Sequence, residues 1–345
     1  MTSTYSQSIS IIRMLATQMI VVCHMFLVWN NSELYHWFNL GVQLFFLISG
    51  YLLSSSNLDN PIIWLKRRIF RIMSDYWCFL LILLLIGLIL HSKIKLDNFI
   101  VLLLGGAGAP AETIASFTSS PNVAPTAHLW FVTYIVICYA FTPLLQKFKC
   151  FINRCSNPKC AWFWLLCCAG SSIVLLSVLA GKVPVFCHSS SFACYILGYC
   201  LAGPLEPHIG KKYSIAIFLF FLGGRIALRI IELQYLHLLT FPGIYSAYRI
   251  AFALCTVGTG TTMFFLLKDF FTRCKVSGIY QKILLFSDRY SYDVYLVHQP
   301  IIHWIFAFIG FQVALLPTAI VLIIVTTLIA SVLLRELTQT FRKLV

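Results

Sequence analysis

Long apolar stretches, separated by short polar segments, follow one another along the whole chain. Each is long enough to cross the hydrocarbon core of a bilayer as a helix of about 20 residues. The sequence therefore predicts an all-α polytopic membrane protein with a single transmembrane domain over residues 1–345. The predicted spans lie at about 8–29, 36–56, 72–91, 127–147, 161–180, 187–204, 213–232, 247–267, 291–310 and 315–334.

Composition supports the same class of protein. Hydrophobic residues make up 60% of the chain, charged residues 10%, and the mean hydropathy is +0.87. These values exclude a soluble domain of this length. The longest segment between predicted spans, 92–126, is rich in Gly, Pro, Ser and Thr. It predicts either a loop over the outer face or a linker with no further role.

The basic residues predict the orientation of the spans, because cytoplasmic loops carry an excess of Lys and Arg. Outer loops hold only Lys93, Lys95 and Lys182. We therefore expect both termini in the cytoplasm and the protein in the inner (cytoplasmic) cell membrane. The net charge of +14 then indicates topology and a face toward anionic lipid, not nucleic-acid binding. The inner segments hold Lys66, Arg67, Arg68, Arg71, Lys147, Lys149, Arg154, Lys159, Lys211, Lys212, Lys268, Arg273, Lys275, Lys282, Arg289, Arg335, Arg342 and Lys343.

Two ionisable residues interrupt the first apolar stretch, Arg13 and His24. On one helix they are separated by about 16 Å of rise, so they lie at different depths near one face. Ionisable residues within a span are costly and indicate a functional site. The structural alternatives are that Arg13 snorkels to the inner surface and that His24 is a hydrogen-bonded core residue.

A basic amphipathic segment, Trp64 to Arg71, follows the second span. Its arginines, Arg67, Arg68 and Arg71, predict one of two roles. They either anchor the chain on anionic lipid or hold the phosphates of a cytosolic ligand through paired hydrogen bonds.

Polar residues also enter the fourth, seventh and ninth spans. Each can be a satisfied structural group, but together with His24 of the first span they predict a basic pocket with three histidines, which suits a reaction chamber better than packing. The polar residues of these three spans are His128 and Trp130, then Arg225 and Arg229 one turn apart, then Asp293, Tyr295 and His298.

Three of the thirteen cysteines recur at five-residue intervals, a spacing that matches no zinc-binding pair, so we predict no metal site.

Four segments occur in the order found in a known family, and the chain resembles the membrane acyltransferase-3 family of multi-pass O-acyltransferases. His128-Leu-Trp-Phe-Val, leading to Tyr139 and Pro143, also resembles the fourth span of that family. The likeness covers nearly the whole chain. The four segments are Arg-x10-His (Arg13, His24), Gly-Val-x-Leu-Phe-Phe-x-x-Ser-Gly-Tyr-Leu (Gly41 to Leu52), Arg-Arg-x-x-Arg (Arg67 to Arg71) and Ser-Tyr-x-x-Tyr-Leu-x-His (Ser291 to His298).

The resemblance implies transfer of an acyl group, usually acetyl, from cytosolic acyl-CoA to a hydroxyl of a cell-surface polysaccharide or lipid-linked glycan. His24 is then the expected general base, because a neutral imidazole can take the proton of a weakly nucleophilic hydroxyl. The expected ligands of the CoA phosphates are Arg13, Arg67, Arg68 and Arg71. The residues expected to contact the acceptor are His128, Trp130, Tyr295, His298, Arg225 and Arg229.

The chain departs from the family pattern at three points. Its fourth span has Trp130-Phe-Val-Thr-Tyr-Ile, without the acid of many glycan-acetylating relatives. Ser74 or Asp75 stands where proline is usual, and Asp293 where a small residue is usual. The alternative interpretation is a transporter or flippase of a glycan intermediate, but no internal repeat or pair of broken helices supports it. The sequence leaves the oligomeric state and the identity of the acyl group open.

Overall fold

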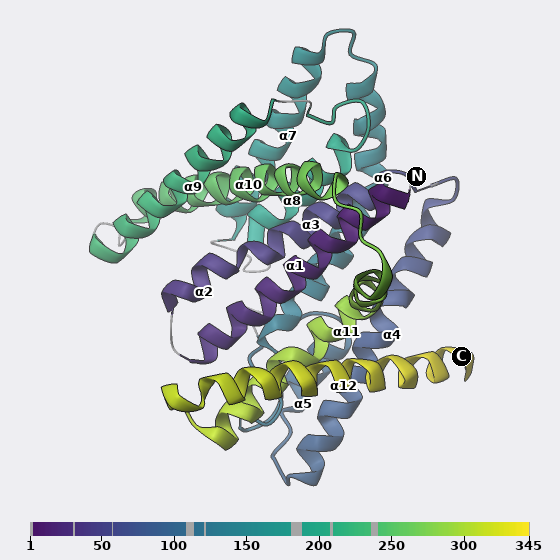
Figure 1. The fold of residues 1–345 in the computed structure, drawn as a ribbon, viewed down its shortest axis with the longest axis vertical. Helices are drawn as coiled ribbons and strands as arrows, with labels where there is room; N and C mark the ends of the chain where they lie inside the picture. The colour runs from purple at the N-terminus through teal and green to yellow at the C-terminus, as the bar shows by residue number, and fades with distance from the viewer. Residues whose placement is uncertain are drawn as a thin grey trace. The chain divides into compact units, whose positions relative to one another are not determined.

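The computed structural model describes residues 3–29, 32–56, 58–107, 114–120, 122–180, 188–207, 210–235 and 241–344 (Figure 1). Lys182 and part of the predicted outer loop, residues 108–113 and 121, lie outside the described residues.

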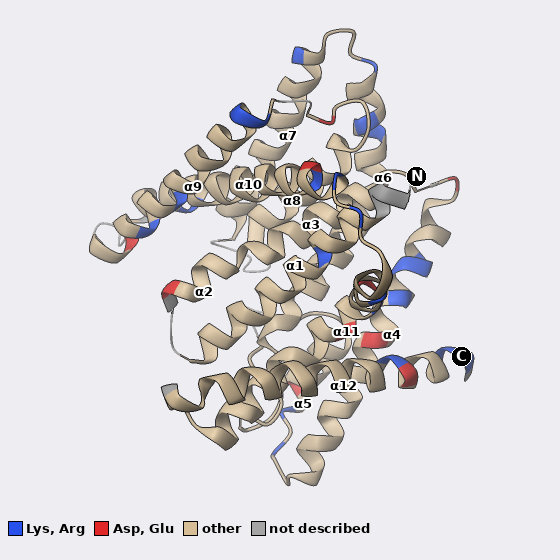
Figure 2. Cartoon of the chain, in the orientation of Figure 1, with Lys and Arg blue, Asp and Glu red and all other residues tan. Residues whose placement is uncertain are grey.

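Helices form nearly all of the described chain, which confirms the predicted all-α membrane class. Within the described ranges, eight helices are long and apolar enough to cross a membrane. Figure 2 shows that Lys, Arg, Asp and Glu residues are sparse along most helices. The helices are α1 (Ser3–Val28), α2 (Ser32–Phe38), α3 (Leu40–Leu53), α4 (Pro61–Ile89), α5 (Leu96–Leu103), η1 (Ala127–Leu129), α6 (Trp130–Asn153), α7 (Pro158–Leu179), α8 (Ser189–Leu201), α9 (Lys211–Gln234), α10 (Pro242–Thr272), α11 (Gly278–Ile309), η4 (Val313–Leu315) and α12 (Leu316–Leu344).

Two of the ten predicted spans are not among these eight long apolar helices. The sixth corresponds to α8, which is apolar but has only 13 residues, and the ninth lies within α11, which also carries charged side chains. The number of ten spans therefore stays a prediction, as does the cytoplasmic position of both termini.

The basic segment and the third predicted span form one continuous helix, α4, of 29 residues. Its start is encoded locally: the Asn60 side chain accepts a hydrogen bond from the Ile63 amide at 3.1 Å, and Pro61 occupies the first turn. The predicted outer loop also contains regular structure, namely α5 and two isolated β-bridges, Ile94–Thr118 and Ser116–Pro125. A continuous α4 connects the basic segment rigidly to the membrane part of the chain.

The chain forms two compact units, and α1 contributes to both. Unit 1 comprises residues 1–16, 40–59 and 140–281. Its closest helix pair is α3 with α8, where glycines allow the backbones to touch. A Cβ atom added to Gly198 would lie 2.2 Å from the Leu47 carbonyl oxygen, and one added to Gly50 would lie 2.3 Å from the Tyr195 carbonyl oxygen.

Unit 2 comprises residues 17–39, 60–139 and 282–345. One core cluster joins α11 to α12 through Ile302, Phe306, Ala319 and Ile323, with Val21 and Met25 of α1 packed against it. The helix α12 also packs on α4. This unit holds most of the predicted site residues.

Candidate functional site

Three histidines from different parts of the sequence meet in unit 2: His24 on α1, His128 on η1 and His298 on α11. Their ring centroids are 5.0 Å apart for His24 and His298, 5.2 Å for His128 and His298, and 6.3 Å for His24 and His128. His128 and His298 are buried, whereas His24 is half-buried. The structure thus brings together the three histidines that the sequence analysis singled out.

Helix α11 fixes His128 from three sides. The Gln299 Oε1 atom accepts a hydrogen bond from the His128 amide at 2.9 Å, and the Tyr295 hydroxyl donates to the His128 carbonyl. The His128 Nε2 atom lies 2.9 Å from the Leu296 carbonyl oxygen. Pro300 explains why that oxygen is open: an ordinary residue at 300 would donate its N–H to the carbonyl of residue 296, but proline has none.

These contacts determine which ring nitrogens carry hydrogen. A carbonyl oxygen only accepts, so His128 is protonated at Nε2, and His298, whose Nδ1 lies 2.6 Å from the Tyr295 carbonyl oxygen, is protonated at Nδ1. The other nitrogen of each neutral ring then bears a lone pair. Both of these nitrogens, and Nδ1 of His24, are buried and have no hydrogen-bond partner among the described residues. The cluster therefore offers hydrogen-bond acceptors for a ligand with hydroxyl donors.

Aromatic side chains surround the histidines. The Phe79 ring of α4 lies edge-on to His128 at 6.1 Å, and the Tyr295 ring lies 5.5 Å from His128 and 4.9 Å from Phe131. Trp130 is half-buried at the start of α6, edge-on to Tyr134. Within the described residues, no group of three or more His, Cys, Asp or Glu has the arrangement of a metal site.

The three arginines of the basic segment lie on the first half of α4. Arg67 and Arg71 are exposed, and the half-buried Arg68 stacks on the Trp64 ring at 5.8 Å. Eight residues, about 12 Å of helix, separate Arg71 from Phe79 at the histidine cluster. One continuous helix thus carries both the basic segment and Phe79, whose ring lies against His128.

The remaining predicted residues belong to unit 1. Arg13 is half-buried on α1. Arg225 is buried with its guanidinium 5.6 Å from the centre of the Phe252 ring. Arg229 forms an ion pair of 2.5 Å with Glu232, which also accepts a hydrogen bond from the Tyr248 hydroxyl at 2.7 Å. An anionic ligand of Arg229 would have to compete with this carboxylate.

Several residues that shape the site were not predicted from the sequence. Gln299 and Pro300 directly follow His298, and this position next to the motif could have identified them. Two acids, Asp75 and Asp293, were given no role by the sequence: Asp75 stood out only as a departure from the family pattern, and Asp293 as such a departure and as a polar residue within the ninth span. In the structure both are buried and ion-paired, Asp75 with Arg342 at 2.9 Å and Asp293 with Arg335 at 3.3 Å.

The fold and the site define a class: an all-helical integral membrane protein with a buried histidine cluster and an arginine segment on one helix. The chain matches the acyltransferase domain of the acyltransferase-3 family over residues 6–336, and it belongs to that family. No curated protein and no solved structure matched the chain. The protein is thus a membrane acyltransferase.

Replacing Pro300 by alanine tests the origin of the His128 orientation. The new amide would compete for the Leu296 carbonyl, so we expect the preference for the Nε2–H tautomer of His128 to weaken by about 1 kcal/mol. Nitrogen-15 NMR of histidine-labelled protein reports the tautomer of each ring. Pro143→Ala, at the proline within α6, is the matched control and should leave the His128 signals unchanged. An unchanged tautomer in Pro300→Ala would contradict this explanation.

Proposed function

We propose that the protein transfers an acetyl group from cytoplasmic acetyl-CoA to a hydroxyl of a cell-surface polysaccharide or lipid-linked glycan at the inner membrane. The observation that carries the proposal is the group of three adjacent imidazoles whose buried nitrogens lack partners among the described residues. The bare nitrogens of His128 and His298 suit a polyhydroxylated acceptor, because each can accept a hydrogen bond from one hydroxyl. Membership of an acyltransferase family supports the reaction type.

In this proposal His24 is the general base. Among the three histidines it is the half-buried one, whereas His128 and His298 are enclosed and have their second nitrogen bound to a carbonyl. The acceptor hydroxyl attacks the thioester carbonyl while the imidazole takes its proton. The tetrahedral intermediate then collapses, the carbon–sulfur bond breaks, and the imidazolium returns the proton to the CoA sulfur. The products are the acetyl ester and free CoA, and His24 is again neutral.

His128 and His298 position the acceptor in this mechanism, because their bare nitrogens can bind its hydroxyls. Tyr295 acts through its hydrogen bond to the His128 carbonyl. Trp130, two residues after His128 and edge-on to Tyr134, would offer the acceptor an aromatic face. Arg225 and Arg229 lie on α9 in unit 1, and their contact with the acceptor stays a proposal.

On the donor side, Arg67, Arg68 and Arg71 would hold the CoA phosphates. Arg13, expected from the sequence as a further ligand, belongs to unit 1, and its role stays a prediction. Exposed guanidinium groups bind phosphate oxygens through paired, charge-assisted hydrogen bonds. The distance of about 12 Å along α4 between Arg71 and Phe79 is one that an extended pantetheine arm can bridge. The thioester would then reach the histidine cluster while the phosphates stay at the arginines.

Removing the three arginines tests this donor site. We expect Arg67→Ala/Arg68→Ala/Arg71→Ala to weaken acetyl-CoA binding by about a hundredfold, because several charge-assisted hydrogen bonds are lost. Equilibrium binding of labelled acetyl-CoA to the detergent-purified protein measures the effect. The control is Lys211→Ala/Lys212→Ala, which removes an exposed basic pair from α9. Equal losses in both variants would mean that the segment contributes only general positive charge.

The function itself is tested with purified wild-type protein, radiolabelled acetyl-CoA and a crude surface-glycan fraction. We expect CoA release that depends on the glycan fraction, with the label recovered in it as a base-labile ester. A protein that neither binds acetyl-CoA nor transfers the label would overturn the proposal.

A further inference from the structure

Two ion pairs, each with a buried aspartate and a partly exposed arginine, connect α12 to the helices that carry the site in unit 2. Arg342 pairs with Asp75 of α4, and Arg335 pairs with Asp293 of α11. The two aspartates are nearly inaccessible, with side-chain exposures of 4% and 0%. The two arginines are seven residues apart on α12 and so lie near one face of that helix. The C-terminal basic residues, which follow the last predicted span, are part of the same packed helix α12.

Arg342 spans the turn of α4 that follows the basic segment. Its Nε atom donates to the Ser74 hydroxyl at 2.7 Å, and its Nη2 atom donates to Asp75 Oδ1 at 2.9 Å and to the Arg71 carbonyl at 2.6 Å. One guanidinium thus holds residues 71, 74 and 75 of α4. A planar fork of five N–H donors makes this arrangement specific to arginine.

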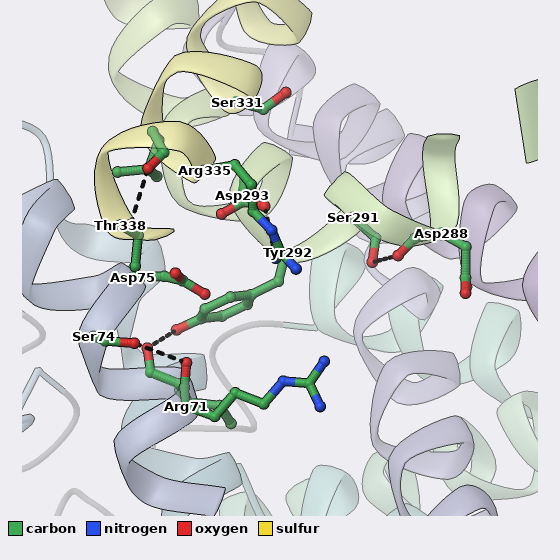
Figure 3. Close-up of polar contacts among 12 residues, drawn as sticks. Arg71, Ser74, Asp75, Asp288, Ser291, Tyr292, Asp293, Ser331, Arg335 and Thr338 are labelled. Carbon is green, nitrogen blue, oxygen red and sulfur yellow. Dashed lines mark hydrogen bonds and ion pairs between the residues drawn. The ribbon is translucent and has the colours of Figure 1, made fainter. Parts of the chain in front are cut away.

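The second pair extends the network to α11. Figure 3 shows Tyr292 beside Asp75, with Asp293 and Arg335 next to it. The Tyr292 hydroxyl donates to the Ile72 carbonyl at 3.3 Å, so α11 also contacts the main chain of the same α4 turn. The Arg71 side chain extends away from this network in the same view, with its guanidinium not engaged by Asp75 (Figure 3).

Stability alone does not explain such pairs. Burying two charges costs several kcal/mol per ion, and well-packed apolar residues of similar volume are often equally stable. The pairs instead fix the position of α12 relative to α4 and α11, because hydrogen bonds are directional whereas apolar contacts are not. The pairs fix the position of the α4 turn that begins at Arg71.

We propose that Arg342 and Asp75 are positioning residues for the donor: they fix the end of the basic segment so that its arginines meet the phosphates of acyl-CoA. This inference rests on the proposed function of Arg67, Arg68 and Arg71. Arg342 acts through the α4 main chain and through Ser74. It contributes little charge of its own, because Asp75 neutralises it.

A paired apolar replacement separates positioning from folding. Asp75→Leu/Arg342→Met removes both charges together and leaves the Ser74 hydroxyl its hydrogen bond to the Arg71 carbonyl. Arg342→Lys keeps the charge opposite Asp75, but its single nitrogen cannot reach all three partners. The matched control, Asp269→Asn/Arg273→Gln, removes an exposed pair from α10.

We expect both Arg342 variants to unfold at about the wild-type temperature in detergent. Their affinities for acetyl-CoA and for 3′,5′-ADP, a probe with only the nucleotide phosphates, should both fall about tenfold. The maximal rate at saturating acetyl-CoA should stay within about twofold of wild type, since the transition-state contacts are unchanged. The control should match the wild type in all four measurements.

The outcomes distinguish this inference from the proposed function. If the wild type does not bind acetyl-CoA, the proposed function fails and the positioning role fails with it. If the wild type binds and both Arg342 variants bind equally well, only the positioning role is wrong. If affinity falls only in step with the unfolding temperature, the pair is structural and the inference is likewise overturned.

Discussion

Replacing His24 by alanine is expected to lower the rate of acyl transfer by a factor of about 10² to 10⁴, the usual contribution of a general base. Binding of acetyl-CoA should be unchanged, because this substitution leaves the arginines that we propose as phosphate ligands in place, including Arg67, Arg68 and Arg71 of α4. The measurement is the release of CoA and the transfer of label at saturating acetyl-CoA, compared with acetyl-CoA binding by the same preparation. The two readouts together separate a chemical defect from a loss of the donor.

Two further variants sharpen this test. His24→Gln keeps a polar side chain of similar size that cannot take up the proton, so it should be as inactive as His24→Ala. His36→Ala removes a histidine of α2 that is not part of the cluster and should retain activity. Substantial transfer by His24→Gln would show that another group is the base. His128 or His298 would then be the next candidates.

The second large effect concerns folding rather than chemistry. We expect Gly198→Ala to destabilise unit 1 by about 3 kcal/mol or more, since an overpacked site between two backbones cannot relax by changing a rotamer. The added Cβ would lie 2.2 Å from the Leu47 carbonyl oxygen and 2.9 Å from the Leu47 Cα atom. Accommodating it requires α3 and α8 to move apart.

Thermal unfolding in detergent and the yield of monodisperse protein measure this effect. Gly170→Ala is the matched control, because a Cβ at Gly170 of α7 would have no other atom within 4 Å. That variant should be as stable as the wild type or slightly more stable, as alanine favours the helix over glycine. Equal stability of Gly198→Ala and Gly170→Ala would contradict the close backbone contact of α3 and α8.

Most of the fold could be predicted from hydropathy, because a bilayer requires long apolar helices whose backbone groups are satisfied internally. The prediction was least informative where helices extend beyond the apolar stretch. The basic segment before residue 72 continues the helix of the third span, since the Asn60 cap and Pro61 start α4 at the surface. Likewise, α12 continues to Leu344, ten residues beyond the last predicted span, which ends at residue 334.

The candidate site could likewise be predicted only in part from the sequence. The sequence by itself identified the membrane class, the acyltransferase resemblance, and His24, His128 and His298 as polar residues in apolar surroundings. It could do so because an ionisable group within a span is costly and therefore conspicuous. The sequence did not show that the three rings lie 5.0 to 6.3 Å apart; this proximity arises only when unit 2 folds.

Only the tertiary structure decided how these groups are held. The open Leu296 carbonyl left by Pro300 fixes the His128 tautomer, and Asp75 and Asp293 are paired with arginines 267 and 42 residues further along the chain. No local pattern encodes such pairings, because the partner of a buried charge is set by which helix faces pack together. The sequence thus determined which residues are costly to bury, and the packing of α4, α11 and α12 determined what compensates them.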